Sequence, residues 1–377
     1  MFFKNLKIFF GYCFKTRWIF KLPKKNKYLV FDGQHIPFFK YIKKKNITIL
    51  YRRGEEINFF IFLKCLLKFK LTTLDYCKEF IKHVSPKLIL TAFDYHTIFY
   101  KLSECTGVKT LMLQKGQRGL NEGIYKNSKN IYFPQNSKKR FFVDYVFVYN
   151  DSVKKFYSDR IRGNFFISGS FENNFYKLDT KKQKKKAVFI SNYSPNEISP
   201  ENRENEDIIV SYLSKLCREK KIQFNLLPRF RKNPALLRKE INFYKKIIDG
   251  NVNFILSKKK TSYELLQNYK YIFSSYSTLA KEFFSKGFRT GFLMFKSKNN
   301  PINTYRFGSY EKLKKKGPFW TSSFSFNKKE TLRVFKYVTE TSNKKWNNQV
   351  KLFRNKILNF DFNNKQLIRI LKKLKNY

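Results

Sequence analysis

Hydroxyl side chains gather in one short stretch of the chain, directly after an apolar run at 271–273. After this cluster, apolar residues recur at helical spacing until Gly287, so the pattern predicts a strand, a loop and a helix. The loop would lie at the amino end of the helix, where unpaired backbone N–H groups and the helix dipole favour an anion such as phosphate. The clustered residues are Ser274, Ser275, Ser277 and Thr278.

Glu282 lies one turn beyond Thr278 on the same face of the predicted helix. Its carboxylate is placed to accept hydrogen bonds from a polyol, such as a ribose attached to the phosphate. The structural alternative is an ordinary β-α-β unit, in which a serine caps the helix and Glu282 faces solvent. This stretch alone favours the structural alternative slightly.

Strands alternate with helices along most of the chain, a rhythm typical of a parallel, doubly wound sheet. Strands are predicted at 28–31, 47–51, 86–91, 109–113, 142–149, 161–168, 187–190, 222–227, 253–255 and 271–273. Helices are predicted at 38–45, 59–69, 73–83, 207–220, 240–247, 263–268, 328–341 and 350–375. A lysine-rich run at 181–186 separates two similar halves and indicates a linker. The predicted division is a first domain at 1–178, a basic linker at 179–186, a second domain at 187–349 and an amphipathic C-terminal helix at 350–377.

Polar residues follow the strands of the first half, and in such a sheet the loops after the strands line the ligand crevice. We therefore expect one rim to collect Asp32, Arg53, Asp94, His96, Gln114 and Arg118, and the glycine-rich loop that begins at Gln114 adds Gly116 as a cleft residue. Asp94 is the first candidate for a general base and His96 the second, with helix capping or a surface position as the alternative for either. Arg118, Arg229 and Arg231 are candidates to bind a diphosphate, since a guanidinium offers two parallel hydrogen bonds. A solvated surface arginine is the alternative for each.

The amino-acid composition limits the classes of protein to which the chain could belong. The 377 residues are 42% hydrophobic and 28% charged, as in a globular chain, and the formal net charge is +52. Such a surface should bind an anionic bilayer at moderate salt, although the basic residues are spread along the whole chain. Five cysteines without metal or disulfide spacing and three histidines favour a reducing cytoplasm and no metal cofactor. Residues 1–20 are apolar but interrupted by basic residues, which predicts either an interfacial helix or a helix packed on the domain.

Several ordered segments carry a resemblance to a known family. They are Asp94 after a strand, Gln114-x-Gly116-x-Arg118 after the next, Asp144-Tyr145, Gly169-Ser170-Phe171 with Asn174, and Gly317-Pro-Phe-Trp-Thr321. Over about 28–346 the chain resembles bacterial surface-carbohydrate biosynthesis proteins, which are transferases of the nucleotide-sugar GT-B type. The sequence departs from that pattern in having no glycine in the hydroxyl turn, Lys115 after the glutamine and Tyr95 after the aspartate.

The resemblance implies two Rossmann-like domains facing across a cleft, with C-terminal helices. It implies an acceptor bound mainly to the first domain and a nucleotide-sugar donor bound mainly to the second, on the hydroxyl turn and Glu282. The expected activity is transfer of a sugar to a surface polysaccharide or lipid-linked acceptor without a metal, in the cytoplasm or on the inner face of the plasma membrane. Two alternatives remain: a non-catalytic scaffold of a polysaccharide-synthesis complex, and a nucleic-acid-binding protein that uses the positive charge.

Overall fold

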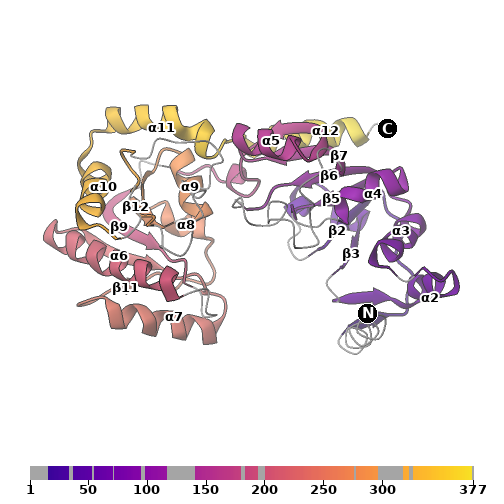
Figure 1. Ribbon diagram of the computed structural model, residues 1–377, viewed down its shortest axis with the longest axis horizontal. Helices are drawn as coiled ribbons and strands as arrows, with labels where there is room; N and C mark the ends of the chain where they lie inside the picture. Colours follow the sequence, from indigo (N-terminus) through magenta and orange to yellow (C-terminus); the bar gives the residue numbers. More distant parts are fainter. Residues whose placement is uncertain are drawn as a thin grey trace.

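A computed structural model describes residues 16–33, 37–52, 55–70, 72–94, 98–116, 141–179, 183–193, 200–275, 277–295, 317–321 and 326–375. The chain forms two α/β domains, each built around its own sheet (Figure 1). The strands of the first domain are β1 (Arg17–Ile19), β2 (Tyr28–Phe31), β3 (Ile47–Leu50), β4 (Glu56–Asn58), β5 (Leu88–Thr91), β6 (Lys109–Leu113), β7 (Phe141–Val148) and β8 (Ile161–Ile167). Its helices are η1 (Pro37–Lys40), η2 (Lys44–Asn46), α2 (Phe59–Leu67), α3 (Thr73–Val84), α4 (Phe99–Thr106), α5 (Asp151–Ser158) and η4 (Asn173–Phe175).

The second domain and the C-terminal segment complete the structure. Their strands are β9 (Lys184–Ile190), β10 (Gln223–Leu227), β11 (Asn253–Phe254), β12 (Tyr269–Ser274) and β13 (Arg289–Phe292). Their helices are α6 (Pro200–Glu219), α7 (Pro234–Ile247), α8 (Ser262–Leu266), α9 (Thr278–Ser285), α10 (Lys328–Glu340), α11 (Asn343–Ile357), η6 (Phe362–Asn364) and α12 (Lys365–Lys375). The predicted parallel α/β architecture is confirmed in both halves.

Both large sheets are parallel, and each has a point at which the strand order reverses. The six-stranded sheet runs β3-β2-β5-β6-β7-β8, so its order reverses between β2 and β5. The five-stranded sheet runs β11-β10-β9-β12-β13, so its order reverses between β9 and β12. Ligands of open α/β sheets bind beside such reversals, outside the carboxyl ends of the strands. In the second domain, the loop at this position after β12 is the hydroxyl turn.

The central strands are short apolar runs because helices or other apolar segments cover both faces of the sheets. In the first domain, Leu29, Phe31 and Ile89 face a core that α3, α4 and α5 complete. Val30 and Leu90 point to the opposite face, which α12 covers. In the second domain, one continuous core joins β9, β10 and β12 to the helices from α6 to α11.

The C-terminal segment corrects the prediction of one helix at 350–377. Two helices, α11 and α12, flank an irregular stretch at 358–364 (Figure 1). The chain turns there because Asn363 and Asn364 adopt left-handed backbone conformations, and buried Asn364 donates a hydrogen bond of 3.0 Å to the Phe171 carbonyl. The turn returns α12 to the first domain, where its apolar side packs against the sheet. The buried residues of that side are Leu367, Ile370, Leu371 and Leu374.

Other local predictions also needed correction. The segment predicted as a helix at 38–45 forms two short 3-10 turns, η1 and η2, where Lys43, the residue before η2, has an extended conformation. Sequence reasoning missed β1 and β4, which pair with each other in a separate two-stranded sheet. It also missed α5, a short helix capped by Asn150, whose side chain accepts a hydrogen bond from the Val153 N–H group at 2.9 Å.

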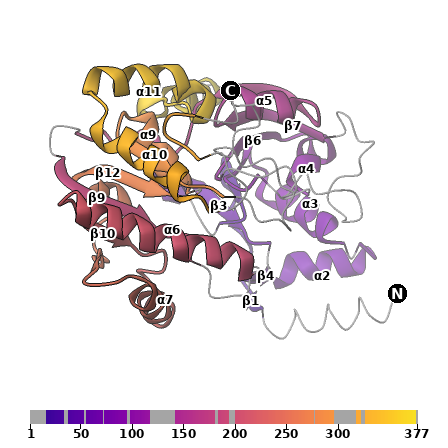
Figure 2. The ribbon, with the colours of Figure 1, turned by 60° about the vertical axis from the view of Figure 1, so that its left-hand side comes forward.

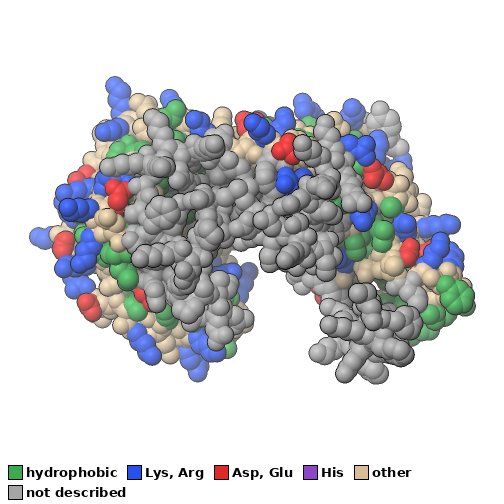
Figure 3. Space-filling view, viewed as in Figure 1, with side chains coloured by type: hydrophobic (Ala, Val, Ile, Leu, Met, Phe, Trp, Pro, Cys, Tyr) green, Lys and Arg blue, Asp and Glu red, His purple; other side chains and the backbone are tan. Residues whose placement is uncertain are grey.

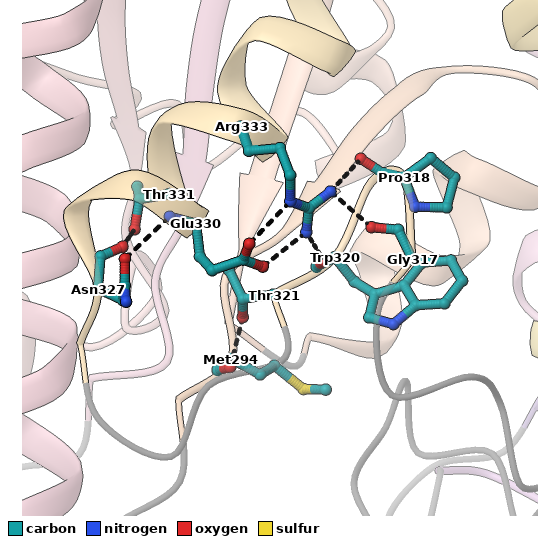
Figure 4. A network of polar contacts seen from close by, with 9 residues as sticks. All are labelled: Met294, Gly317, Pro318, Trp320, Thr321, Asn327, Glu330, Thr331 and Arg333. Atoms are coloured by element: carbon teal, nitrogen blue, oxygen red, sulfur yellow. Dashed lines mark hydrogen bonds and ion pairs between the residues drawn. The ribbon is translucent and has the colours of Figure 1, made fainter.

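The segment Gly317–Thr321 is part of the second domain's core structure. The N–H group of Phe292 donates to the Phe319 carbonyl at 2.9 Å, so the segment extends the edge of the sheet beyond β13. Arg333 on α10 holds the segment by donating to the carbonyls of Gly317, Pro318 and Trp320, while it also pairs with Glu330 (Figure 4). Trp320 is buried against Phe319 and Phe353, which is a core position and not a stacking surface for a sugar.

We expect Gly169→Ala to destabilise the protein by about 2–4 kcal/mol. Gly169 has a φ of +74°, and a Cβ atom there would lie 1.8 Å from the carbonyl oxygen of Asn359 in the returning C-terminal segment. Gly107→Ala is the matched control, because Gly107 has a φ of +70° and no atom of the described residues lies within 4 Å of its Cβ position. It should cost about 1 kcal/mol, the conformational penalty alone. Urea denaturation of both variants measures the difference, and equal losses would contradict the close approach.

Candidate functional site

The hydroxyl turn lies between β12 and α9, as predicted. Ser274 is buried and has a structural role: its hydroxyl donates to the Ile190 carbonyl at 3.3 Å and accepts from the Ser277 N–H group at 3.2 Å. Asn192, from the loop after β9, also donates to this hydroxyl at 3.3 Å. Ser274 thus joins the two loops at the reversal of the second sheet. It shapes the turn, which leaves the other hydroxyls of the turn to meet a ligand.

The remaining residues of the turn stand at the amino end of α9. Ser277 precedes the helix with an extended backbone and makes no side-chain cap within the described part of the chain, while Thr278 begins the helix, and both are partly exposed. The Ser275 hydroxyl is buried, and none of the described residues forms a hydrogen bond with it. A buried hydroxyl without a partner is costly, and a bound polar group would remove that cost. The first turn of α9 therefore combines N–H groups and hydroxyls that suit a phosphate.

Glu282 is buried between the two domains. Ser170, from the loop after β8 of the first domain, donates to one carboxylate oxygen, and Tyr263 on α8 donates to the other at 2.6 Å. Burial raises the pKa of Glu282 to about 7, and these two hydrogen bonds oppose the rise. The alternative in which Glu282 faces solvent is therefore wrong, since the side chain is buried and two hydrogen bonds hold it in place.

Other contacts between the first domain and α9 surround this carboxylate. Asn173 donates to the Ser285 hydroxyl at 3.2 Å, and Lys286 donates to the Tyr176 carbonyl. The Tyr176 ring stacks on Tyr263 with centroids 4.1 Å apart. The loop 169–176 and α9 therefore form the described junction between the domains beside the candidate site.

A cavity of about 60 Å³ opens beside Glu282. Seven of the eight lining residues belong to the first domain and Glu282 belongs to the second, so the cavity lies at the carboxyl ends of the first sheet's strands, where the second domain meets it. The lining residues are Ala92, Leu113, Gln114, Lys115, Ser170, Phe171, Glu172 and Glu282. The cavity brings carboxylates, an ammonium and an amide to one place, a set of groups able to bind a hydroxyl-rich ligand.

The predicted residues of the first domain do follow the strands, but they differ in exposure. Gln114 lines the cavity and also accepts a hydrogen bond from the Tyr149 N–H group at 2.8 Å, which fixes its amide. Asp94 is buried and accepts a hydrogen bond from the Tyr157 hydroxyl at 2.8 Å. Asp32 is buried directly after β2, with a left-handed backbone. Gly116 accepts a hydrogen bond from the Gln114 amide at 3.0 Å through its carbonyl.

Arg53, His96 and Arg118 lie outside the described residues. Arg229 is exposed after β10 and donates to the Tyr193 carbonyl at 3.3 Å. Arg231 donates to the Ser257 carbonyl at 2.8 Å and to the Ser262 hydroxyl at 2.7 Å, so its guanidinium ties two loops of the second domain together. Arg229 is therefore better placed than Arg231 to reach a ligand.

Two buried glutamates that sequence reasoning missed shape the loops on one side of the turn. Glu240 on α7 accepts hydrogen bonds from the N–H groups of Arg229 and Phe230, at 2.9 and 3.0 Å, and from the Ser191 hydroxyl. Glu206 on α6 accepts from the Asn192 N–H group at 3.0 Å, and burial raises its pKa to about 7. A glutamate within a helical pattern predicts a solvent-facing residue, so the sequence carried no signal for either position.

Two further motif residues are structural. Asp144 accepts hydrogen bonds from the Ser103 hydroxyl at 2.9 Å and the Thr110 N–H group at 2.8 Å, which joins β7 to α4 and β6. Asn174 donates to the Ser168 carbonyl and to Asn364, both at 2.8 Å, and thereby anchors the returning C-terminal segment. Within the described ranges, no three His, Cys, Asp or Glu side chains are grouped as a metal site.

The comparisons with known proteins agree with this architecture. A family model described as "putative O-antigen biosynthesis protein" matches residues 111–375. No curated protein sequence matches the chain significantly.

Solved structures with the same fold are similar over nearly the whole chain. MnaA of S. aureus, solved with UDP, is 13% identical with a TM-score of 0.51, over 93% of this chain and 97% of that chain. A variant of the wall teichoic acid polymerase TagF is 10% identical with a TM-score of 0.51, over 94% and 90%. The UDP-GlcNAc 2-epimerase of Methanocaldococcus jannaschii, solved with UDP-GlcNAc and UDP, is 12% identical with a TM-score of 0.50, over 92% and 99%. The fold is therefore GT-B, with two Rossmann-like domains.

We expect Glu282→Gln to reduce the pH dependence of stability between about pH 5 and pH 8, while Glu206, with a pKa also raised to about 7, keeps its own contribution. Burial raises the pKa of Glu282 to about 7 in the folded protein. The folded state therefore keeps a proton that the unfolded chain has already released, and the stability gained in this way is lost as the pH rises through 7. Over this pH range, the free energy of unfolding of the wild type should fall by on the order of 1–3 kcal/mol more than that of Glu282→Gln.

Urea denaturation at several pH values measures this difference. Glu219→Gln is the matched control, because Glu219 is exposed on α6. It should keep the slope of the wild type. A Glu282→Gln variant with that same slope would show that the carboxylate is ionised in the folded protein throughout the range.

Proposed function

Because the chain belongs to the O-antigen biosynthesis protein family, we propose that it transfers a sugar from a nucleotide-sugar donor to a growing surface polysaccharide or a lipid-linked acceptor. The observation that carries the proposal is that the amino end of α9 presents N–H groups and hydroxyls, and that Glu282 follows one turn later on the same helix. The amino end of α9 offers N–H groups and hydroxyls to a diphosphate, and Glu282 reaches the cavity between the domains. The solved structures with bound UDP have the same fold and favour a uridine nucleotide.

The donor would bind mainly to the second domain. Ser275, Ser277 and Thr278 would contact the diphosphate, with Arg229 balancing part of its charge. Glu282 would accept hydrogen bonds from the ribose hydroxyls while Ser170 and Tyr263 keep its carboxylate in place. Preorganisation of this kind lowers the entropic cost of binding.

The acceptor would bind to the first domain, near Gln114, Gly116 and Arg118. The acceptor oxygen would form a bond to the anomeric carbon as the bond from that carbon to the diphosphate oxygen breaks. The acceptor proton would pass to Asp94, or to His96 as the alternative base, and the negative charge would leave on the nucleoside diphosphate. Cationic groups and helix N–H groups would stabilise that charge without a metal ion.

We expect one of UDP, CDP and GDP to raise the melting temperature of the protein, with UDP the leading candidate. Glu282→Ala and Thr278→Val should weaken binding of that nucleotide about tenfold or more, since each loses a hydrogen bond to it. Thr278→Val keeps the shape of the side chain and so guards against misfolding of the Glu282 variant. Glu219→Ala, an exposed change on α6, should bind as the wild type does. Undiminished binding by both site variants would refute the donor-site assignment.

An assay of donor turnover distinguishes a catalytic transferase from a non-catalytic scaffold. The donor is incubated with membrane lipid extract as the source of acceptor, and release of the nucleoside diphosphate is measured. We expect Asp94→Asn to lower the rate about a hundredfold or more if Asp94 takes the proton. If the wild type binds the nucleotide but produces no nucleoside diphosphate from the donor, the result would instead support a non-catalytic scaffold. An unchanged rate in Asp94→Asn would move the role of base to His96.

A further inference from the structure

The outer face of α2 is apolar although nothing in the described structure covers it. Ile61 and Cys65 point inward and pack toward α3. The opposite face of the helix exposes large apolar side chains, and the exposed set continues just past the end of the helix. Its members are Phe60, Leu63, Leu66, Leu67 and Phe69. Single exposed apolar residues are common on protein surfaces, but a contiguous group of this size marks an interaction site.

The Phe69 side chain is almost fully exposed to solvent and contributes little to the packed core. Its side chain is 92% exposed, and its backbone has a φ of +53° directly after α2. Glycine or asparagine is favoured at such a position, and a bulky residue there costs free energy. Leu67 is similar in exposure, at 73%. These side chains therefore point to a contact outside the chain.

The strand β1 enlarges the same surface. It pairs with β4, which leads directly into α2, so the segment after β1 lies beside the start of the helix. Phe20 in that segment is exposed, and its ring lies 5.2 Å from the ring of Phe59. Trp18 packs edge-on against Phe62, with centroids 5.5 Å apart. Figure 2 shows β1, β4 and α2 together at the edge of the first domain, away from the second sheet.

Exposed lysines flank these apolar residues along the chain. Six of them are exposed, of which Lys68 also pairs with Glu79: Lys21, Lys24, Lys25, Lys64, Lys68 and Lys70. In the space-filling view, the apolar side chains over α2 lie beside Lys and Arg side chains at the lower right of the molecule (Figure 3). Lysine stems cover apolar surface while their ammonium groups extend toward a charged boundary. The combination of an apolar face and a cationic border is complementary to the interface of an anionic bilayer.

We propose that the face formed by α2, the end of β1 and their lysines, here named the α2 face, docks on an anionic phospholipid membrane. Apolar side chains would enter the boundary of the acyl chains, and the lysines would contact lipid phosphates. A second copy of the chain is a poorer partner, since each copy would bring the same cationic border. Nucleic acid would satisfy the lysines but would leave Leu67 and Phe69 in water. Among the described residues, no helix is long and apolar enough to cross a membrane.

Vesicle flotation tests this docking with the full-length chain. Vesicles of phosphatidylcholine are compared with vesicles that also contain phosphatidylglycerol, at about 0.15 M salt. The double variant Leu67→Ser with Phe69→Asn removes the two most exposed apolar side chains, and asparagine tolerates the backbone at position 69. Leu352→Ser is the matched control, because Leu352 is 57% exposed on α11 of the second domain.

We expect the wild type and Leu352→Ser to bind the phosphatidylglycerol vesicles, and the double variant to bind at least about tenfold more weakly. Its urea denaturation should match that of the wild type, which excludes misfolding. Wild-type binding by the double variant, or no wild-type binding to anionic vesicles, would overturn the proposal. Sedimentation that shows a dimer dissociated by the double variant would assign the α2 face to a second copy. Vesicle binding requires no nucleotide, so its failure is distinguishable from failure of the donor-site proposal.

Discussion

The desolvated carboxylate of Glu282 is the interaction on which the candidate site depends. A carboxylate is stable between two domains only if hydrogen-bond donors compensate for the lost water. Ser170 and Tyr263 supply them, one from each domain, so the same contact orients the proposed ligand-binding group and joins the two domains. A change at any of these three residues should therefore affect binding and domain arrangement together.

Buried carboxylates also fix the loops after β9 and β10, which lie beside the hydroxyl turn. Glu240 and Glu206 accept hydrogen bonds from backbone N–H groups of the loops after β10 and β9, respectively. Buried acceptors of this kind hold loops in place where sheet hydrogen bonds have ended. The second domain thus positions the loops of the candidate site with carboxylates from α6 and α7.

Much of this architecture could be predicted from the sequence, because buried parallel strands are short apolar runs and the loops after them share one edge. That reasoning located the turn at Ser275 and placed Gln114 beside a cavity. It failed where a distant contact decided the conformation. The irregular stretch before α12 depends on Asn174 and Phe171, nearly two hundred residues earlier in the sequence. The polar partners of Glu282 likewise come from separate segments, so no local pattern could indicate that this glutamate is buried.

The return of α12 to the first domain has a consequence for motion. The chain passes from one domain to the other between β8 and β9, and passes back between α11 and α12. Two connections define a line, and rotation about that line changes the backbone of both segments least. Opening and closing of the cleft should thus follow one preferred axis. The two connecting segments of the chain would resist rotation of the domains about any other axis.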